Sequence, residues 1–272
     1  MFKTLIEECQ LRNYSKRTSE SYLYFNKKFI KFCNKKTQEV NYKDIRSFLL
    51  HLISRGYSSS YVNLAHNSIN FYYTQICKRK FEKISFQKRE QKIKEILSKE
   101  EIVKLIEVTD NIKHKLIISL LYSSGIRISE LIKIKLNDID LKNKTLLVKQ
   151  GKGKKDRYVI ASKKFIKDAM QYLESRKDNN PYMFISDHNK EQHITIRTAE
   201  EIVKKSAKSA NIRRRVFPHA LRSTFATHLY QNGVDAFSLQ KLLGHARIET
   251  TRGYTKTDFR MINSITSPLD LD

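Results

Sequence analysis

Four segments between residues 120 and 258 carry side chains that could act together on a phosphate group. Arginine guanidinium groups can bind two phosphate oxygens at once, while lysine, histidine and tyrosine side chains can move a proton or attack phosphorus. In chain order these side chains are Arg127, Lys152, His219, Arg222, His245 and Tyr254. Taken singly, each has an ordinary structural explanation, such as a solvated arginine or a surface tyrosine. Their joint occurrence in this order argues against that explanation.

The first of these segments is LLYSSGIRISEL. Arg127 follows Gly125 by two residues and begins a new helix, away from any apolar stripe. Glu130 comes one turn later, where its carboxylate is placed to reach back toward Arg127. By itself this segment would fit an exposed arginine at a helix start with a glutamate partner equally well.

The segment PHALRSTFATHL predicts a helix that begins at Pro218. Residues three apart share a helical face, so His219 and Arg222 lie together. An apolar face is predicted for the same helix, formed by Leu221, Phe225 and Leu229. One turn therefore presents an imidazole and a guanidinium side by side.

Two glycine-containing turns carry the remaining groups. KQGKGKKDRYVI lies between strand-like runs at 146–148 and 157–160, which predicts a hairpin with Lys152 at its tip, where a DNA backbone could approach. A basic hairpin tip alone indicates only phosphate contact. In KLLGHARIETTRGYTKTD, Gly244 ends a helix, His245 follows, and Tyr254 stands nine residues further on in a stretch with no helical stripe. Tyr254 is therefore not an obvious core residue.

The elements that must position these groups fall into two domains. Residues 1–80 show apolar residues at helical spacing, clearest from Ile45 to Ile53, and predict a bundle of about four helices with GYSSS as a connector and cap. Residues 81–97 are basic with irregular apolar positions, typical of an extended linker, although a solvated helix is an alternative. Ser98 and Glu101 form a predicted capping box, so a catalytic domain is expected over 98–272.

The composition favours a polyanionic partner. The chain has 53 Lys and Arg against 28 Asp and Glu, a formal net charge of +25. Such a surface should bind nucleic acid and release it as salt rises. No apolar run approaches the ~20 residues of a membrane span, and the N-terminus lacks a signal-peptide core, so we expect a cytoplasmic, nucleoid-associated protein. Cys9, Cys33 and Cys77 form no CxxC pair and are expected to be reduced packing residues.

In this order, GIRISEL, GKG, PHALR, LLGH and TTxxY resemble the catalytic boxes of the tyrosine recombinases, closest to the Xer-type and phage-type integrases. The resemblance spans essentially the whole chain, with RTSESYLYF and GYSSSYVN similar to the core-binding domain of that family. Two departures are visible. Ser223 stands where many relatives carry His, and Arg252–Gly253 precedes the tyrosine where a longer side chain is common.

The resemblance implies an α+β fold, mainly α with a small β-sheet, in which a helical SAM-like core-binding domain and a catalytic domain form a C-shaped clamp on DNA. It implies that Tyr254 attacks a phosphodiester to give a 3′-phosphotyrosine, and that a 5′-hydroxyl reverses the step without ATP, metal or other cofactor. Arg127, Arg222 and His245 would bind the nonbridging oxygens, with Glu130 in support. Lys152 would protonate the departing 5′ oxygen, and His219 would assist proton transfer at the tyrosine.

The same resemblance implies the partners of the chain. They are double-stranded DNA with paired specific sites and three further copies in a homotetramer, or a non-identical partner recombinase. A tail helix with Phe259, Met261, Ile262 and Ile265 would dock on a neighbouring subunit, although packing within the same chain is an alternative. The basic residues expected to contact DNA are Arg79, Lys80, Lys88, Arg89, Lys154 and Lys155.

Resolution of chromosome or plasmid dimers is the expected role, and integration of a phage or mobile element is the alternative. A type IB topoisomerase shares the active-site logic but needs no specific paired site. A metal-dependent nuclease is a further class, because Asp138 and Asp140 could ligate Mg²⁺, although a turn-capping role fits them better. A degenerate recombinase that only binds DNA is the last.

Overall fold

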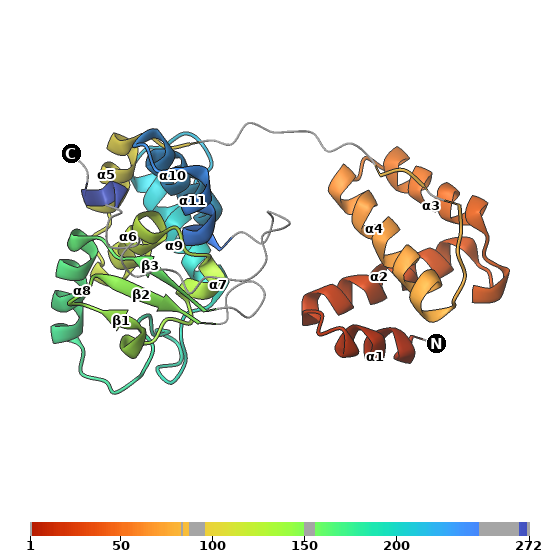
Figure 1. The fold of residues 1–272 in the computed structure, drawn as a ribbon, viewed down its shortest axis with the longest axis horizontal. Coiled ribbons are helices and arrows are strands. Elements are labelled where there is room, and N and C mark those ends of the chain that lie inside the picture. The colour runs from red at the N-terminus through yellow and green to blue at the C-terminus, as the bar shows by residue number, and fades with distance from the viewer. Residues whose placement is uncertain (1, 83, 87–95, 150–155, 245–266, 271–272) are drawn as a thin grey trace. The chain divides into compact units, whose positions relative to one another are not determined.

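The computed structural model describes residues 2–82, 84–86, 96–149, 156–244 and 267–270. The chain forms two compact units, Met1–Lys92 and Ile93–Asp272. Each is mostly helical, and the second contains a small three-stranded antiparallel sheet (Figure 1). The fold is therefore α+β with few strands, as the sequence predicted.

The N-terminal unit is a bundle of four α-helices. They are α1 (Lys3–Leu11), α2 (Lys16–Cys33), α3 (Tyr42–Ser54) and α4 (Ser59–Phe71), followed by a π-helical turn, η2 (Tyr72–Ile76). Ser15, Asn41 and Ser58 cap α2, α3 and α4 by accepting hydrogen bonds from backbone N–H groups in the first turn. Their side chains satisfy donors that a helix start otherwise leaves unpaired.

The core of this unit is aromatic. The predicted stripes face it, with Phe25, Phe29 and Phe48 almost fully buried, while Ile53 at the end of α3 is exposed. All three cysteines are free, with Cys9 buried and Cys33 and Cys77 packed at the edge of the core, so the packing role predicted for them is confirmed.

Helix α6 (Ile112–Ser124) is the centre of the C-terminal unit. Ten of its own side chains are buried, including all from Leu116 to Ser124, and most of these are apolar or small. This is the pattern of a helix enclosed by other elements. Figure 1 shows α6 between α8 (Lys163–Ser175) and α10 (Pro218–Gln231), and it contacts both. It ends at Gly125, whose φ of +60° favours glycine and where a Cβ would overlap the ring of Phe225.

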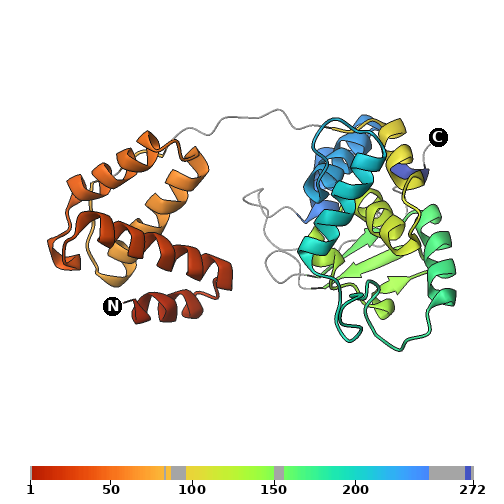
Figure 2. The same cartoon turned by 180° about the vertical axis from the view of Figure 1, so that it is seen from behind.

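Four further α-helices of this unit lie among the described residues: α5 (Lys99–Glu107), α7 (Ile128–Leu131), α9 (Ile196–Ser209) and α11 (Ala236–Leu243). The predicted capping box at the start of α5 is confirmed, since Ser98 and Glu101 exchange side chain to backbone bonds. Figure 2 shows the unit from behind, with α9 toward the viewer. The short turn η4 (Pro268–Asp270) packs on α6, and Ser267 Oγ donates to the carbonyl of Ser123 at 3.1 Å.

The sheet has the order β1–β2–β3 and is antiparallel throughout. It consists of β1 (Ile139–Asp140), β2 (Thr145–Val148) and β3 (Arg157–Ile160). The predicted hairpin is therefore confirmed, with Leu146 opposite Val159 and Val148 opposite Arg157. The helix predicted to begin at Arg127 is α7 (Ile128–Leu131), which has a single turn.

Residues 81, 82, 84–86, 96 and 97 are the described part of the expected linker, and none of them is helical or in a strand. Phe81 and Ile84 pack against the N-terminal core, and Leu97 is buried in the C-terminal core. Among the residues that the structure describes, no helix combines the length and apolar character needed to span a bilayer.

Candidate active site

Arg127 precedes α7 as its N-cap and is held by Glu130. The Glu130 carboxylate accepts from the backbone N–H of Arg127 at 2.9 Å and from its Nη1 at 2.8 Å. The predicted contact from Glu130 back to Arg127 is confirmed. The second terminal nitrogen, Nη2, donates to the carbonyl of Gly244 at 2.9 Å. The guanidinium is thus fixed at both ends while its side chain stays 24% exposed.

Glu130 is bound by a second arginine, Arg157, at the start of β3. Nη1 and Nη2 of Arg157 donate to the two carboxylate oxygens at 2.9 and 2.8 Å, a bidentate pair. Both side chains are buried, at 8% and 6% exposure. Burial opposes ionisation of Glu130, but the bonds and charge of Arg157, followed by those of Arg127, outweigh it and lower the Glu130 pKa to about 2. Glu130 is therefore a carboxylate at any working pH.

Arg222 reaches the same place from α10. Its guanidinium is buried and donates to the carbonyl of Gly125 and, at 2.6 Å, to the carbonyl of Leu243. Burial, and then the charge of Arg127, lower the Arg222 pKa to about 10. The side chain still carries its charge at neutral pH, although burial disfavours the charged form.

The three arginines meet at the C-terminal end of α11. Arg157 Nε donates to the carbonyl of Leu242 at 3.2 Å, Arg222 to that of Leu243, and Arg127 to that of Gly244. The last carbonyls of a helix have no partner within it and carry partial negative charge, so cations stabilise this end. Three consecutive carbonyls are held in this way, directly before His245 in the sequence.

His219 lies on the turn of α10 that also carries Arg222, as predicted. It is exposed, whereas Arg222 is buried, yet both line a small cavity of about 220 Å³. Ser223, which departs from the expected histidine, places its Oγ 3.4 Å from Nδ1 of His219. The imidazole is thus exposed to solvent beside Arg222.

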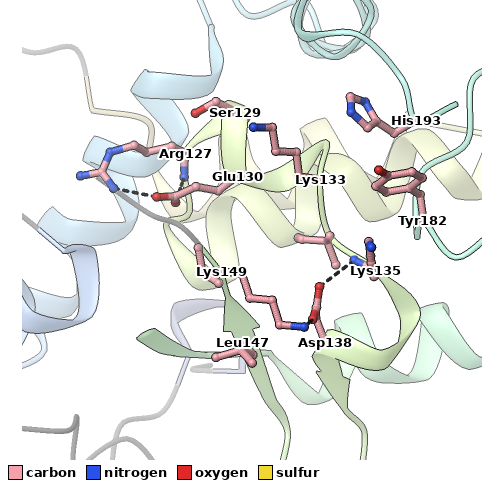
Figure 3. A pocket seen from close by; sticks show the side chains of 12 residues that line it. Arg127, Ser129, Glu130, Lys133, Lys135, Asp138, Leu147, Lys149, Tyr182 and His193 are labelled. Atoms are coloured by element: carbon pink, nitrogen blue, oxygen red, sulfur yellow. Dashed lines mark hydrogen bonds and ion pairs between the residues drawn. The ribbon is translucent and has the colours of Figure 1, made fainter. Parts of the chain in front are cut away.

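A larger cavity of about 690 Å³ opens beside Arg127 and Glu130 (Figure 3). Arg127 and Glu130 lie at one end, and Tyr182 and His193 lie at the other. Its lining is cationic on balance, since it includes Arg127, Lys133, Lys135 and Lys149 against Glu130 and Asp138. Such a lining suits a polyanion backbone more than an apolar ligand.

The acidic pair that could have served a metal-dependent nuclease is engaged otherwise. Asp138 pairs with Lys149 at 2.6 Å and accepts from the backbone of Lys135. Asp140 accepts from the backbone and side chain of Asn143 in the turn between β1 and β2, as the turn-capping interpretation expected. Over the described ranges, no three His, Cys, Asp or Glu side chains are grouped to hold a metal ion.

Several predicted site residues lie outside the residues that the structure describes: Lys152, His245, Tyr254, Lys88, Arg89, Lys154, Lys155, Phe259, Met261, Ile262 and Ile265. Lys80 is exposed. Arg79 donates to the carbonyls of Thr37, Gln38 and Val40 and so holds the end of the bundle to the segment before α3. Its expected contact with DNA stays a prediction.

Arg157 is the residue of this cluster that the sequence interpretation missed, because RYVI was taken only as a strand. A signal was present. Strand side chains alternate, so Arg157 shares a face with Val159, which is fully buried. An arginine on a buried face needs a carboxylate partner, and Glu130 supplies it.

Both units of the chain are similar to known proteins. The phage integrase family matches residues 95–261, and the N-terminal SAM-like domain of phage integrases matches residues 1–83. Tyrosine recombinase XerA of Pyrococcus horikoshii is 36% identical over 257 residues, covering 94% of this chain and 87% of that protein.

Two solved structures have a similar fold. A crystal structure of XerA recombinase superposes with a TM-score of 0.54 at 29% identity and covers 95% of this chain and 91% of that one. A crystal structure of XerH site-specific recombinase bound to its difH substrate superposes with a TM-score of 0.71 at 23% identity, and the match covers 87% of this chain and 74% of that one. The matches over both units and the identity to XerA show that this chain belongs to the phage integrase family of tyrosine recombinases.

Proposed function

We propose that the chain is a site-specific recombinase that cleaves and rejoins double-stranded DNA through a 3′-phosphotyrosyl bond at Tyr254. The observation that carries the proposal is the convergence of Arg127 and Arg222. Arg127 is the N-cap of α7 and Arg222 lies in α10, yet their guanidinium groups bind the adjacent carbonyls of Gly244 and Leu243. Two permanent cations at one point are what a phosphate under nucleophilic attack requires.

The chemistry follows from the charges. As the Tyr254 oxygen attacks phosphorus, negative charge grows on the nonbridging oxygens, and fixed guanidinium groups stabilise it without reorganising. A phenol with a pKa of ~10 is protonated at neutral pH, so a neighbouring group must accept its proton. We assign that assistance to His219, protonation of the leaving 5′ oxygen to Lys152, and a third contact to the phosphate to His245.

The substrate is proposed from the charge of the chain. A formal net charge of +25 and the cationic cavity beside Arg127 fit a duplex backbone. We propose paired specific sites, bound by four copies that exchange C-terminal tails or by two copies each of this chain and a partner recombinase. In this proposal the N-terminal bundle and the residues that link it to the catalytic unit grip the duplex. We propose resolution of chromosome or plasmid dimers in the cytoplasm as the biological role, and integration of a phage or mobile element as the alternative.

The test captures the covalent intermediate. The purified chain is incubated with a pool of duplexes that have a randomised core and a nick at one of several positions, so that a short 5′-hydroxyl fragment diffuses away after cleavage. We expect SDS-resistant complexes with wild type, also in EDTA, and none with Tyr254→Phe. Sequencing the captured DNA should reveal one enriched duplex, called the selected duplex below.

Each contrary result has a definite meaning. Capture that requires a divalent metal, or that persists in Tyr254→Phe, would refute the proposed nucleophile. Capture with no enriched sequence would favour a topoisomerase over a site-specific recombinase. Binding of the pool without any capture would leave only a DNA-coating protein.

A further inference from the structure

We infer that Arg157 is a positioning residue for strand cleavage, holding Glu130 and the end of α11 so that Arg127 is kept for the phosphate. The inference rests on the proposed function and adds a residue that does not itself touch the scissile phosphate. Arg157 acts through its two partners, the Glu130 carboxylate and the Leu242 carbonyl.

Arg127 and Arg157 share the Glu130 carboxylate. Its Oε1 accepts from both Arg127 Nη1 and Arg157 Nη1, and its Oε2 accepts from the Arg127 backbone and from Arg157 Nη2. Without Arg157, Arg127 would be the one guanidinium among the described residues that still hydrogen-bonds this buried carboxylate. A buried carboxylate attracts its remaining cation strongly, so Arg127 would be drawn toward Glu130 and away from a phosphate.

Arg157 also contributes to the net charge around Glu130. Arg127, Arg157 and Arg222 together with one carboxylate leave two positive charges in excess. Replacing Arg157 with a neutral residue leaves one. Because the cluster is largely removed from water, each unit of charge has a larger effect on a phosphate than it would have at the surface.

The C-terminal end of α11 packs on Arg157. A Cβ on Gly244 would lie 3.2 Å from both Cδ and Nε of Arg157, so the end of the helix rests closely on the Arg157 stem. Gly244 also has a φ of +60°, which favours glycine. Arg157 thus sets the start of the segment that leads in sequence to His245 and Tyr254.

The experiment measures single-turnover cleavage of the selected duplex at saturating DNA, and separately the Kd for that duplex, in Arg157→Gln and Arg157→Lys. We expect cleavage by Arg157→Gln to fall about 10- to 100-fold while the Kd changes by less than about threefold, since misplacement of catalytic groups affects the reaction more than DNA binding. Arg157→Lys keeps the charge without the bidentate geometry and should restore part of the rate.

The matched control is Arg176→Gln. Arg176 is as buried as Arg157, at 7% exposure, and pairs with Asp178 in the same unit, but it contacts neither Glu130 nor α11 among the described residues. It should lose thermal stability as Arg157→Gln does and keep its cleavage rate. If Arg176→Gln lost as much cleavage activity as Arg157→Gln, Arg157 would have only a structural role.

A double-mutant cycle sharpens the test. Glu130→Gln removes the carboxylate that Arg157 neutralises, so the double variant Glu130→Gln/Arg157→Gln should cleave no more slowly than Arg157→Gln alone. Multiplying losses would contradict the inference.

The outcomes separate the two proposals. Tyr254-dependent capture by wild type with an unchanged rate in Arg157→Gln overturns the role of Arg157 alone. Absence of capture by wild type overturns the proposed function. If Arg157→Gln does not fold, Arg157→Lys carries the test, and a wild-type rate there overturns the need for bidentate pairing.

Discussion

Two clusters of this chain hold cations in opposite ways. In the catalytic unit, Arg127, Arg157 and Arg222 are mostly buried, and their donors are fixed on one carboxylate and on backbone carbonyls. In the N-terminal bundle, Lys28 lies over the rings of Tyr24, Tyr57 and Tyr61, at 5.8, 4.7 and 5.3 Å from their centroids. The first cluster can be called the arginine cluster and the second the tyrosine cluster.

The two differ in what neutralises the charge. Glu130 offsets part of the arginine cluster, whereas among the described residues Lys28 has no ion pair with a carboxylate and donates to the Tyr61 hydroxyl at 3.0 Å. Tyr24 and Tyr57 stay 52% and 42% exposed. Aromatic faces steady an ammonium while leaving its charge unneutralised toward water. We therefore expect the arginine cluster to bind one phosphate in a fixed geometry, and the tyrosine cluster to offer an accessible positive charge to DNA.

The largest expected effect is on the arginine cluster. Arg127→Ala and Arg222→Ala should each slow single-turnover cleavage of the selected duplex about 10²- to 10³-fold, because each removes a fixed donor from the transition state. Arg176→Ala is the control and should cleave at the wild-type rate. A loss of DNA affinity that accounts for the whole effect would contradict a role in the chemical step.

The next largest effect is expected for Gly125→Ala, which should lower the free energy of unfolding. The substitution places a Cβ in the ring of Phe225 at a left-handed φ and moves the carbonyl that Arg222 binds. Backbone strain and overpacking together should cost about 3 kcal/mol of unfolding free energy, measured in urea. Gly56 also has a positive φ, but no atom lies within 4 Å of the Cβ that alanine would add there. Gly56→Ala therefore measures the cost of backbone strain without overpacking. Equal losses in the two variants would remove the argument from packing.

Acid should weaken the arginine cluster. The folded pKa of Glu130 is about 2 against an ordinary 4.5, so its stabilisation is complete above pH 4.5 and is lost as pH falls from 4.5 toward 2. The loss should reach up to about 3 kcal/mol over that window. Unfolding measured across these pH values should show a smaller decline in Glu130→Gln than in wild type, and parallel declines would contradict the assignment.

The smallest effect is expected in the tyrosine cluster. Lys28→Ala should weaken binding of the selected duplex by less than about tenfold and reduce the slope of log Kd against log salt by about one, the signature of one lost phosphate contact. Cleavage at saturating DNA should not change. The exposed neighbour Lys27 provides the control variant Lys27→Ala. An equal effect of the two substitutions would show that Lys28 contributes only general charge.

The sequence predicted the arginine cluster in part because local rules act there. A helix start at Arg127, an acidic residue one turn later and a proline-initiated helix before Arg222 are all short-range signals, and the structure contains each of them. Caps at Ser58 and Ser98 were found by the same reasoning.

Arg157 shows where that reasoning stops. Its partner is 27 residues away, and the carbonyl that it binds in α11 is 85 residues away. Contacts of this kind depend on how the sheet packs beside α7 and α11, which no local pattern states. The buried bond between Tyr122 and His228, at 2.8 Å, was missed for the same reason.

Arg127 and Arg222 should neutralise charge on one scissile phosphate. The most direct test uses the selected duplex carrying a methylphosphonate at the cleavage position, which removes the charge of a nonbridging oxygen. The cleavage defect of Arg222→Ala relative to wild type should shrink at least about tenfold on this neutral linkage, because the charge that Arg222 stabilises is no longer there. An equal defect on both linkages would contradict the account.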